Sequence, residues 1–443
     1  MLYAARVSQQ LEASAERFRA FADSEAVAFR RFDQALSQLD RLDHDELLAL
    51  LADAQHPGAL PGDEWVDRPG LLLPFATRFA HHRSAREWAL EHITGVATVA
   101  VDGSEIKPTK DYSLPIAAVQ VAWFENPHQE NGRYVKDAAF ELIHPDELTG
   151  EPGDGFGTAD QKLALRRFQA EVRTLIERME ALAARGWHDH PPVAFFDGSL
   201  VVSFTAGMFE DFGTRYIEAI CHLLRASEQA GIPVVGYVDT SLAKDVTTML
   251  AVLGDLPRPQ RVPDSRLLDA RMSWGDRTRA LICAREGVLE RYRIEGGLTP
   301  PSRAPLATGD GEGSPDSPSP FPMERGRRDE ATPGGGVRQV PADYSQEICF
   351  VYLKTNGLAP PARLDLPRWV VREGLLDYVV DVVRAEVIVG NGYPYCIETA
   401  DACAVLSVRD RERFYRLLQE FATRQGIGLR IVPKAASKRR RRV

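Results

Sequence analysis

Residues 99–106 read VAVDGSEI, and residues 193–200 read VAFFDGSL. In both stretches a short run of apolar residues leads directly into Asp-Gly-Ser. A run of this kind predicts a buried strand, and a glycine in the next position permits a sharp turn. The sequence therefore predicts two strands of one sheet, each with a carboxylate, Asp102 or Asp197, at the point where it ends.

The position of these carboxylates indicates chemistry rather than turn formation alone. One Asp-Gly-Ser is ordinary turn chemistry, but open α/β sheets bind ligands beyond the carboxyl ends of their strands. Two carboxylates on neighbouring strands repel each other and are costly to bury unless a cation lies between them. Asp239, in GYVDTS, is a third candidate of the same kind. Hard oxygen ligands suit Mg²⁺ or Mn²⁺, so the pattern predicts a divalent metal site.

The segments around the two motifs predict a mixed α/β fold. Three consecutive strands with short connections predict an antiparallel meander, and the alternation of strands and helices that follows predicts parallel strands with right-handed crossovers. Helices are expected on both faces of this mixed sheet. The predicted meander strands are 96–101, 114–124 and 133–143, followed by a helix at 160–185, a strand at 192–200, a helix at 208–230, a strand at 232–241 and a helix from 241.

The rest of the chain divides by composition. Residues 1–70 are expected to be a helical extension that ends in a loop at 57–69, and residues 90–295 the first part of the core. Residues 296–340 are rich in Pro, Gly and Ser and predict a disordered insertion. The core resumes at 341–432 with a strand at 347–355 and helices at 371–388 and 409–425, and 433–443 form a basic tail. This tail is expected to be solvated, or else to make weak, salt-sensitive phosphate contacts.

In the N-terminal extension, Phe29, Phe32, Leu36, Leu39 and Leu42 recur at helical spacing. The stripe that they form predicts packing on the chain's own core, with a partner subunit as the alternative. By position and amphipathicity alone, these helices are the expected contact for a dimer or a partner protein.

The overall composition favours a reduced, cytoplasmic protein. No run of about 18 apolar residues predicts a membrane span, and the N-terminus lacks the apolar stretch of a signal peptide. The five cysteines are scattered and form no CxxC motif, which argues against a disulfide framework or a structural zinc site. The net charge of −9 argues against a general nucleic-acid coat protein but is compatible with an acidic metal centre beside a local basic groove.

A third acid for the metal site is expected on the helix at 160–185. At 100° per residue, Glu171 falls roughly 60° from the centre of the apolar stripe, whereas Glu177 and Glu180 point away from it. Glu171 is therefore the acid expected to face the sheet. The alternative is a residue at the edge of the stripe, paired with Arg167.

The order of these motifs resembles the NurA nuclease family. The similarity rests on VDGS, the meander, the helix with an inward Glu, the strand with DGSL and a late GYPY segment, and it covers most of the chain from about residue 95, except the insertion. The resemblance implies an RNase H-like fold and a Mn²⁺-dependent DNA nuclease with 5′-to-3′ exonuclease and single-strand endonuclease activity. It also implies a homodimer that works with a hexameric HerA-type ATPase in processing DNA ends.

By this resemblance the site residues are Asp102, Glu171, Asp197 and the tyrosine of GYPY, for which Tyr393 is preferred over Tyr395. The alternative for Tyr393 is a core aromatic residue. In archaeal members a histidine follows the GYP motif near the position of Asp401, but this chain has no histidine after His222. We expect Asp401 to supply the remaining metal ligand, with two ions shared among the four carboxylates. An aspartate there favours Mg²⁺ or Mn²⁺ but removes a proton shuttle.

Three other functions are weighed against this one. An actin-like ATPase or kinase also places Asp-Gly turns at strand ends, but no glycine-rich phosphate loop is found. A metal-dependent adhesion module would need a D-x-S-x-S motif, and here Ile106 stands in the place of the second serine. A NurA-like subunit of weak activity that mainly docks the translocase is the third alternative, because the family histidine is missing.

Overall fold

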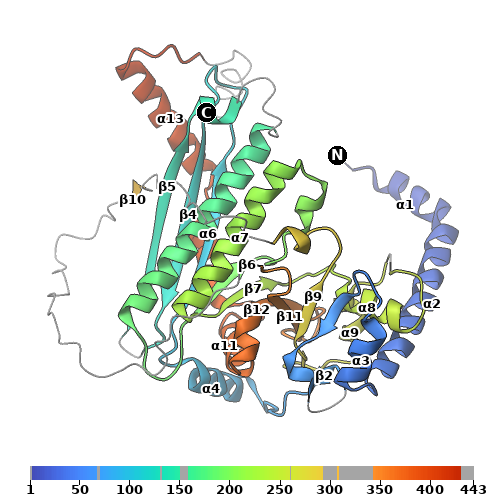
Figure 1. The fold of residues 1–443 in the computed structure, drawn as a ribbon. Helices are drawn as coiled ribbons and strands as arrows, with labels where there is room; N and C mark the ends of the chain where they lie inside the picture. The colour runs from blue at the N-terminus through green and yellow to red at the C-terminus, as the bar shows by residue number, and fades with distance from the viewer. Residues whose placement is uncertain are drawn as a thin grey trace.

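The computed structural model describes residues 2–66, 70–129, 132–149, 158–259, 261–292, 307–308 and 343–430. The described strands form one mixed sheet of 12 strands, in which the main path runs β1-β9-β11-β12-β7-β6-β3-β4-β5-β10 and β2 and β8 pair beside it (Figure 1). The strands are β1 (Gly58–Pro61), β2 (Leu72–Leu73), β3 (Thr98–Ile106), β4 (Ala117–Asn126), β5 (Val135–Ile143), β6 (Val193–Asp197), β7 (Val234–Val238), β8 (Arg277–Thr278), β9 (Leu281–Ala284), β10 (Ala307–Thr308), β11 (Ile348–Leu353) and β12 (Ala362–Pro367).

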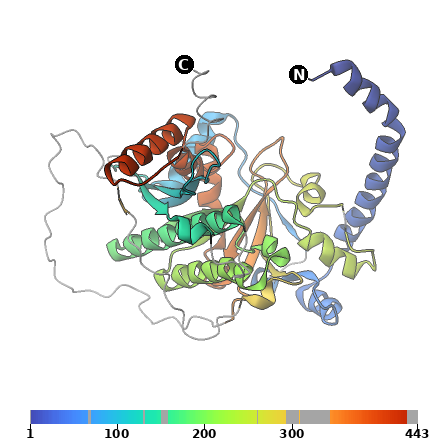
Figure 2. The same ribbon diagram turned by 90° about the horizontal axis from the view of Figure 1, so that it is seen from above.

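Helices cover both faces of the sheet, as the sequence predicted. Figure 2 shows α6 and α7 side by side on one face. No helix in the described part of the chain combines the length and the apolar composition needed to cross a bilayer. The helices are α1 (Ala4–Ala13), α2 (Ala15–Leu39), α3 (His44–Leu51), α4 (His82–Ile93), α5 (Pro145–Thr149), α6 (Ala159–Arg185), α7 (Glu210–Ala230), α8 (Asp245–Leu253), α9 (Asp264–Asp269), α10 (Arg368–Arg372), α11 (Leu376–Val389), α12 (Tyr395–Ala404) and α13 (Val408–Arg424), with 3₁₀ turns η1 (Asp63–Val66), η2 (Ser203–Gly207) and η3 (Leu289–Arg291).

The middle of the sheet has an RNase H-like topology. β3, β4 and β5 form the predicted antiparallel meander. β6 lies parallel to β3 on its other side, and β7 lies parallel to β6. The resulting order β5-β4-β3-β6-β7, with only β4 reversed, is the strand order of the RNase H-like fold, and it confirms the predicted fold class.

Two apolar cores hold the sheet between its helical layers. Side chains alternate across a strand, and Val99 and Val101 of β3 enter the core shared with α6 and α7. Ala100 enters the second core, shared with α11 and α12. The same alternation directs Asp102 towards α12, which places a carboxylate beside the face that carries the GYPY segment.

The structure corrects the prediction that Asp102 ends its strand. β3 continues for four residues to Ile106 because β4 pairs with it along the whole length, from Thr98 opposite Asn126 to Ile106 opposite Ala118. Only the parallel partner β6 stops, at Asp197. Asp102 therefore lies inside a strand, at the level where one of its two neighbours has ended.

Other boundaries also differ from the prediction. The segment 57–69, expected to be a loop, contains β1, which pairs with β9. The helix expected from residue 241 starts at Asp245, and β12 was not predicted. The predicted disordered insertion at 296–340 lies outside the described residues except for β10, and so does the basic tail at 433–443.

The second half of α2 packs on the chain's own core, as expected. Phe32, Leu36 and Leu39 are buried in the core, and Phe29 and Leu42 pack against it. In contrast, no residue of α1 is buried, and this helix extends away from the body of the molecule (Figures 1 and 2).

Candidate metal centre

Asp102 and Asp197 lie side by side on neighbouring parallel strands. The last paired positions of β3 and β6 are Val101 and Phe196, and the two aspartates are the next residues of their strands. Asp239 follows the end of β7, one strand further, and is exposed. The sheet thus brings three carboxylates to one edge.

The segment before α12 brings Tyr393 to this edge. Its hydroxyl donates a hydrogen bond to Asp197 Oδ1 over 3.2 Å, and its ring meets Tyr237 edge-on with 5.2 Å between centroids. The turn that carries Tyr393 is tight, since a Cβ on Gly390 would lie 1.9 Å from the Tyr393 carbonyl oxygen. Tyr395, the alternative in the GYPY segment, packs edge-on against Phe124 instead.

Asp401 lies on α12 and joins the same group of acids. Burial, together with the charges of Asp401 and Asp197 and a hydrogen bond with Asp401, raises the pKa of Asp102 to about 6. Asp197 is exposed, yet partial desolvation raises its pKa as well. Repulsion from Asp401 adds to this rise. Asp102, Asp197 and Asp401 therefore interact as one acidic cluster.

Glu171 approaches the cluster from α6, across Gly103. A Cβ on Gly103 would lie only 2.5 Å from Glu171 Oε1, so the absence of a side chain there permits the approach. Glu171 is mostly buried, with 12% of its side chain exposed. It thus faces the sheet, as its helical position predicted.

Glu171 also forms an ion pair with Arg167. The ion pair that the sequence offered as the alternative for this glutamate is therefore present as well. Arg167 Nη1 donates to Glu171 Oε1 over 2.7 Å and to the carbonyl oxygen of Gly103 over 3.2 Å. The pKa of Glu171 is nevertheless raised to about 8, because burial and the charges of Asp102 and Asp197 outweigh the attraction to Arg167. Glu171 is therefore largely protonated at neutral pH in the absence of further positive charge.

The chemistry of these side chains fits a divalent cation. All four acids offer hard oxygen ligands. Burial and mutual repulsion raise the pKa values of Asp102, Glu171 and Asp197 despite the nearby charge of Arg167. Within the described ranges, no three His, Cys, Asp or Glu side chains are placed so that they could hold a metal ion as they stand. The carboxylate of Glu171 is turned to Arg167, and a cation would require it to reorient.

A family model for the NurA domain matches residues 96–406, more than half of the chain. The chain belongs to the NurA family. The NurA domain begins just before β3 and ends just after α12, so it contains Asp102, Glu171, Asp197, Tyr393 and Asp401. No curated protein sequence matches this NurA chain.

Several solved structures resemble the fold at low sequence identity. A NurA structure with manganese is 10% identical, covers 92% of this chain and 98% of its own, and has a TM-score of 0.38. Endonuclease V from Bacillus subtilis is 11% identical, covers 77% of this chain and 92% of its own, and has a TM-score of 0.28. The catalytic domain of human endonuclease V is 12% identical, with 86% and 96% coverage and a TM-score of 0.27.

From the sequence, Arg167 was considered only as the partner of Glu171 in the alternative arrangement, and Gly103 was given no role at the site. The signal for Arg167 was its spacing of four residues before Glu171 on one helix. For Gly103 the signal was the repeated Asp-Gly-Ser, which was interpreted as turn chemistry although the glycine lies within β3. Glu398, one helical turn before Asp401, is exposed, and no interaction with the acidic cluster is seen for it in the described structure.

Proposed function

We propose that this NurA protein is a metal-dependent DNA nuclease that hydrolyses phosphodiester bonds in DNA ends and single strands, with 5′-to-3′ exonuclease and single-strand endonuclease activity. The observation that carries the proposal is the position of Asp102 and Asp197, each one residue beyond the last paired residues of β3 and β6, in a NurA domain. Family membership supports the nuclease class.

The proposed metal ligands are Asp102, Glu171, Asp197 and Asp401. When bound, two divalent ions, Mn²⁺ or Mg²⁺, would supply the charge that activates a water molecule and stabilises the leaving 3′ oxygen. Asp102, between the other acids, is the candidate for the shared ligand. The raised pKa of Asp102 supports this role, since it reflects burial of the carboxylate and repulsion from Asp401 and Asp197, both of which a bound cation would offset.

Tyr393 and Arg167 are positioning residues in this proposal. Burial and the charge of Asp197 raise the pKa of the Tyr393 hydroxyl, so it stays protonated at neutral pH and donates a hydrogen bond to the Asp197 carboxylate. This bond fixes the orientation of that carboxylate. Arg167 holds Glu171 above Gly103 until the glutamate turns towards the cluster.

We also propose that the chain forms a homodimer and works with a hexameric HerA-type ATPase. Membership of the NurA family supports this part, together with the exposed apolar residues of α1 and α2. Leu11, Phe18 and Phe21 are 55%, 57% and 44% exposed. Light scattering of the chain, with and without such an ATPase, tests it.

A cleavage assay tests the proposed activity. Purified chain is incubated with end-labelled single-stranded DNA, and the products are resolved by length, with Mn²⁺, with Mg²⁺ and with EDTA. The proposal predicts products in either metal and none in EDTA. If no metal supports cleavage but the ATPase binds, the chain is instead a docking subunit, which is the function that the missing histidine would favour.

A further inference from the structure

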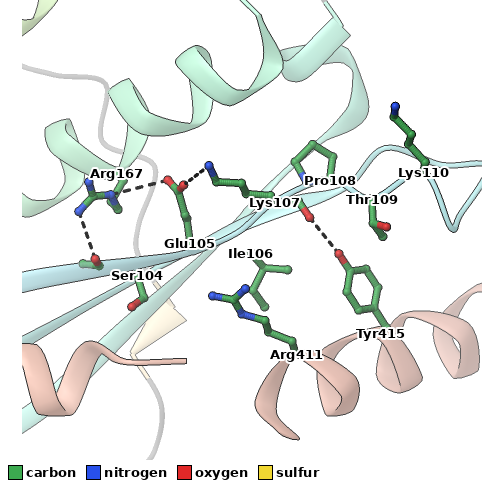
Figure 3. Close-up of a pocket in the computed structure, with 11 residues that line it drawn as sticks. Ser104, Glu105, Ile106, Lys107, Pro108, Thr109, Lys110, Arg167, Arg411 and Tyr415 are labelled. Carbon is green, nitrogen blue, oxygen red and sulfur yellow. Dashed lines mark hydrogen bonds and ion pairs between the residues drawn. The ribbon is translucent and has the colours of Figure 1, made fainter. Parts of the chain in front are cut away.

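A cleft of about 720 Å³ begins at Gly103, the residue after Asp102 of the acidic cluster. The last residues of β3 and the loop after it form one wall, from Gly103 to Lys110, and Arg411 and Tyr415 of α13 form another. Arg167 of α6 also lines the cleft and lies beside Glu105 (Figure 3). The volume lies within the range of about 300–1,000 Å³ that is usual for ligand sites.

The lining of this cleft is basic, whereas the chain as a whole carries a net negative charge. Lys107, Lys110, Arg167 and Arg411 contribute four positive charges, and Glu105 is the single acid in the lining, whereas the chain carries a net charge of −9. A concentration of one sign of charge in a cleft attracts ligands of the opposite sign. The ligand indicated is therefore an anion.

The single acid of the cleft is already compensated. Glu105 lies 3.6 Å from Arg167 Nε and 3.3 Å from Lys107 Nζ, so the three side chains form a row along the strand (Figure 3). Lys110 and Arg411 are exposed, and neither makes an ion pair with another described residue. Their charges are available to a ligand.

The loop that carries the two lysines is fastened to α13. The Tyr415 hydroxyl donates to the carbonyl oxygen of Lys107 over 3.0 Å, and its ring stacks on Tyr112 at 4.8 Å with an angle of 9° between the rings. Gln419 Nε2 donates to the Tyr112 hydroxyl over 3.0 Å. The wall of the cleft is thus held in place by the protein itself.

We propose that this cleft is a groove for the phosphate backbone of a single nucleic-acid strand, which it holds next to the acidic cluster. The inference rests on the proposed nuclease function and names the path of its substrate. The positive groups come from three separate elements and extend outward from Asp102, which suits a chain of repeated phosphates better than one small anion. The Tyr415 ring is already stacked on Tyr112, so the groove offers contacts to phosphates rather than to bases and is expected to bind without regard to sequence.

Binding without divalent ions tests the groove. The full chain is titrated in EDTA with a fluorescein-labelled 20-nucleotide thymidylate strand, and anisotropy gives Kd at several salt concentrations. In the Lys110→Ala/Arg411→Ala double variant, Kd should rise on the order of tenfold at low salt, and the salt slope should fall by roughly 1.4, since each phosphate contact to a single strand contributes about 0.7. A uridylate strand of equal length, measured in parallel, shows whether DNA or RNA is the preferred source of the phosphates.

Arg409→Ala is the matched control. Arg409 lies two residues before Arg411 on the same helix, about 160° away around its axis, so its loss removes the same charge from outside the groove and should leave Kd and slope unchanged. Arg411→Glu should weaken binding more than Arg411→Ala. If the double variant binds both strands with the wild-type Kd and slope, the groove assignment is wrong.

Cleavage assays of the same proteins separate this inference from the proposed function. If the wild type binds through the groove but does not cleave in Mn²⁺, the groove assignment stands and the proposed nuclease activity is wrong. If the wild type cleaves and the double variant binds and cleaves equally well, the proposed nuclease activity stands and the groove assignment is wrong.

Discussion

Asp102 and Asp197 are neighbours across the parallel β3–β6 pair, each one residue beyond the last paired positions of the two strands. This relationship concentrates negative charge where β6 ends and β3 continues. Asp401 adds to the repulsion on both aspartates, and Asp239 adds to the repulsion on Asp197. Four testable consequences follow from the geometry of this cluster and its supports.

Asp102→Asn should stabilise the protein above pH 6. The folded state raises the pKa of Asp102 from 3.8 to about 6, so its contribution to stability is complete below pH 3.8 and is lost as the pH rises through 6. An asparagine does not ionise and avoids this loss. In EDTA at pH 8 the free energy of unfolding should increase on the order of 1–2 kcal/mol.

Thermal melts at pH 4 and pH 8 measure this effect. The melting temperature of Asp102→Asn should exceed that of the wild type at pH 8 and approach it at pH 4. Asp23→Asn changes an exposed aspartate of α2 and should have no such pH-dependent effect. A variant that melts below the wild type at pH 8 would contradict the repulsion.

Manganese should stabilise the wild type and not the variants of the paired aspartates. A ligand that binds only the folded state adds about 2.7 kcal/mol at a concentration one hundred times its Kd. Differential scanning calorimetry with increasing Mn²⁺ should show a rising melting temperature for the wild type and Asp23→Asn, and little change for Asp102→Asn and Asp197→Asn. An equal rise in all four proteins would place the metal elsewhere.

Arg167→Met should destabilise the protein through Glu171. The arginine lowers the pKa of this mostly buried glutamate, although burial still raises it to about 8. Without Arg167 the pKa of Glu171 should rise further, so the destabilisation should be greater at pH 9, where the glutamate of the wild type is charged, than at pH 6. Urea unfolding at both pH values measures the difference.

The double variant Arg167→Met/Glu171→Gln controls for loss of the arginine side chain itself. Since it leaves no unpaired buried charge, it should recover a large part of the stability at pH 9, with a coupling energy on the order of 1–2 kcal/mol. Additive effects of the two substitutions would show that the ion pair is not the cause.

Gly103→Ala should displace Glu171. The new methyl group would lie 2.5 Å from Glu171 Oε1, 3.1 Å from Glu171 Cγ and 3.0 Å from Arg167 Cγ, and overpacking of this kind costs about 1–3 kcal/mol. Activity in Mn²⁺ should fall as well, because the glutamate can no longer approach the strand. Gly207→Ala is the control, since a Cβ there meets no atom within 4 Å; a similar loss in both variants would contradict the steric explanation.

The succession of the central strands and helices along the chain could be predicted from local patterns, but the length of β3 could not. The polar residues after Val101 look like a turn, and it is pairing with the next strand, β4, that keeps Asp102–Ile106 extended. The strand β12 was not predicted either, because it too depends on pairing with other strands, β11 and β7. Arg363 and Asp365 are fully buried in it, and a charged pair predicts a buried strand only when partners such as Asp245 on α8 are known.

The individual acids were easier to predict than their connections. Asp102 and Asp197 follow apolar runs, and Glu171 follows from helical periodicity. The basic cleft depends on α13 and the loop after β3, which lie some 300 residues apart in the chain. No local pattern relates Arg411 to Lys110, so only the folded structure shows that they share one surface.

The most direct test of the central claim is the rate of single-stranded DNA cleavage in Mn²⁺ by the wild type, Asp102→Asn, Asp197→Asn and Asp239→Asn. The first two variants should lose activity by about a thousandfold or more, because each removes an oxygen ligand of the proposed catalytic cations. Asp239→Asn, which removes an exposed acid beside the pair, should retain activity within about tenfold of the wild type. Cleavage at the wild-type rate by both Asp102→Asn and Asp197→Asn would contradict the account.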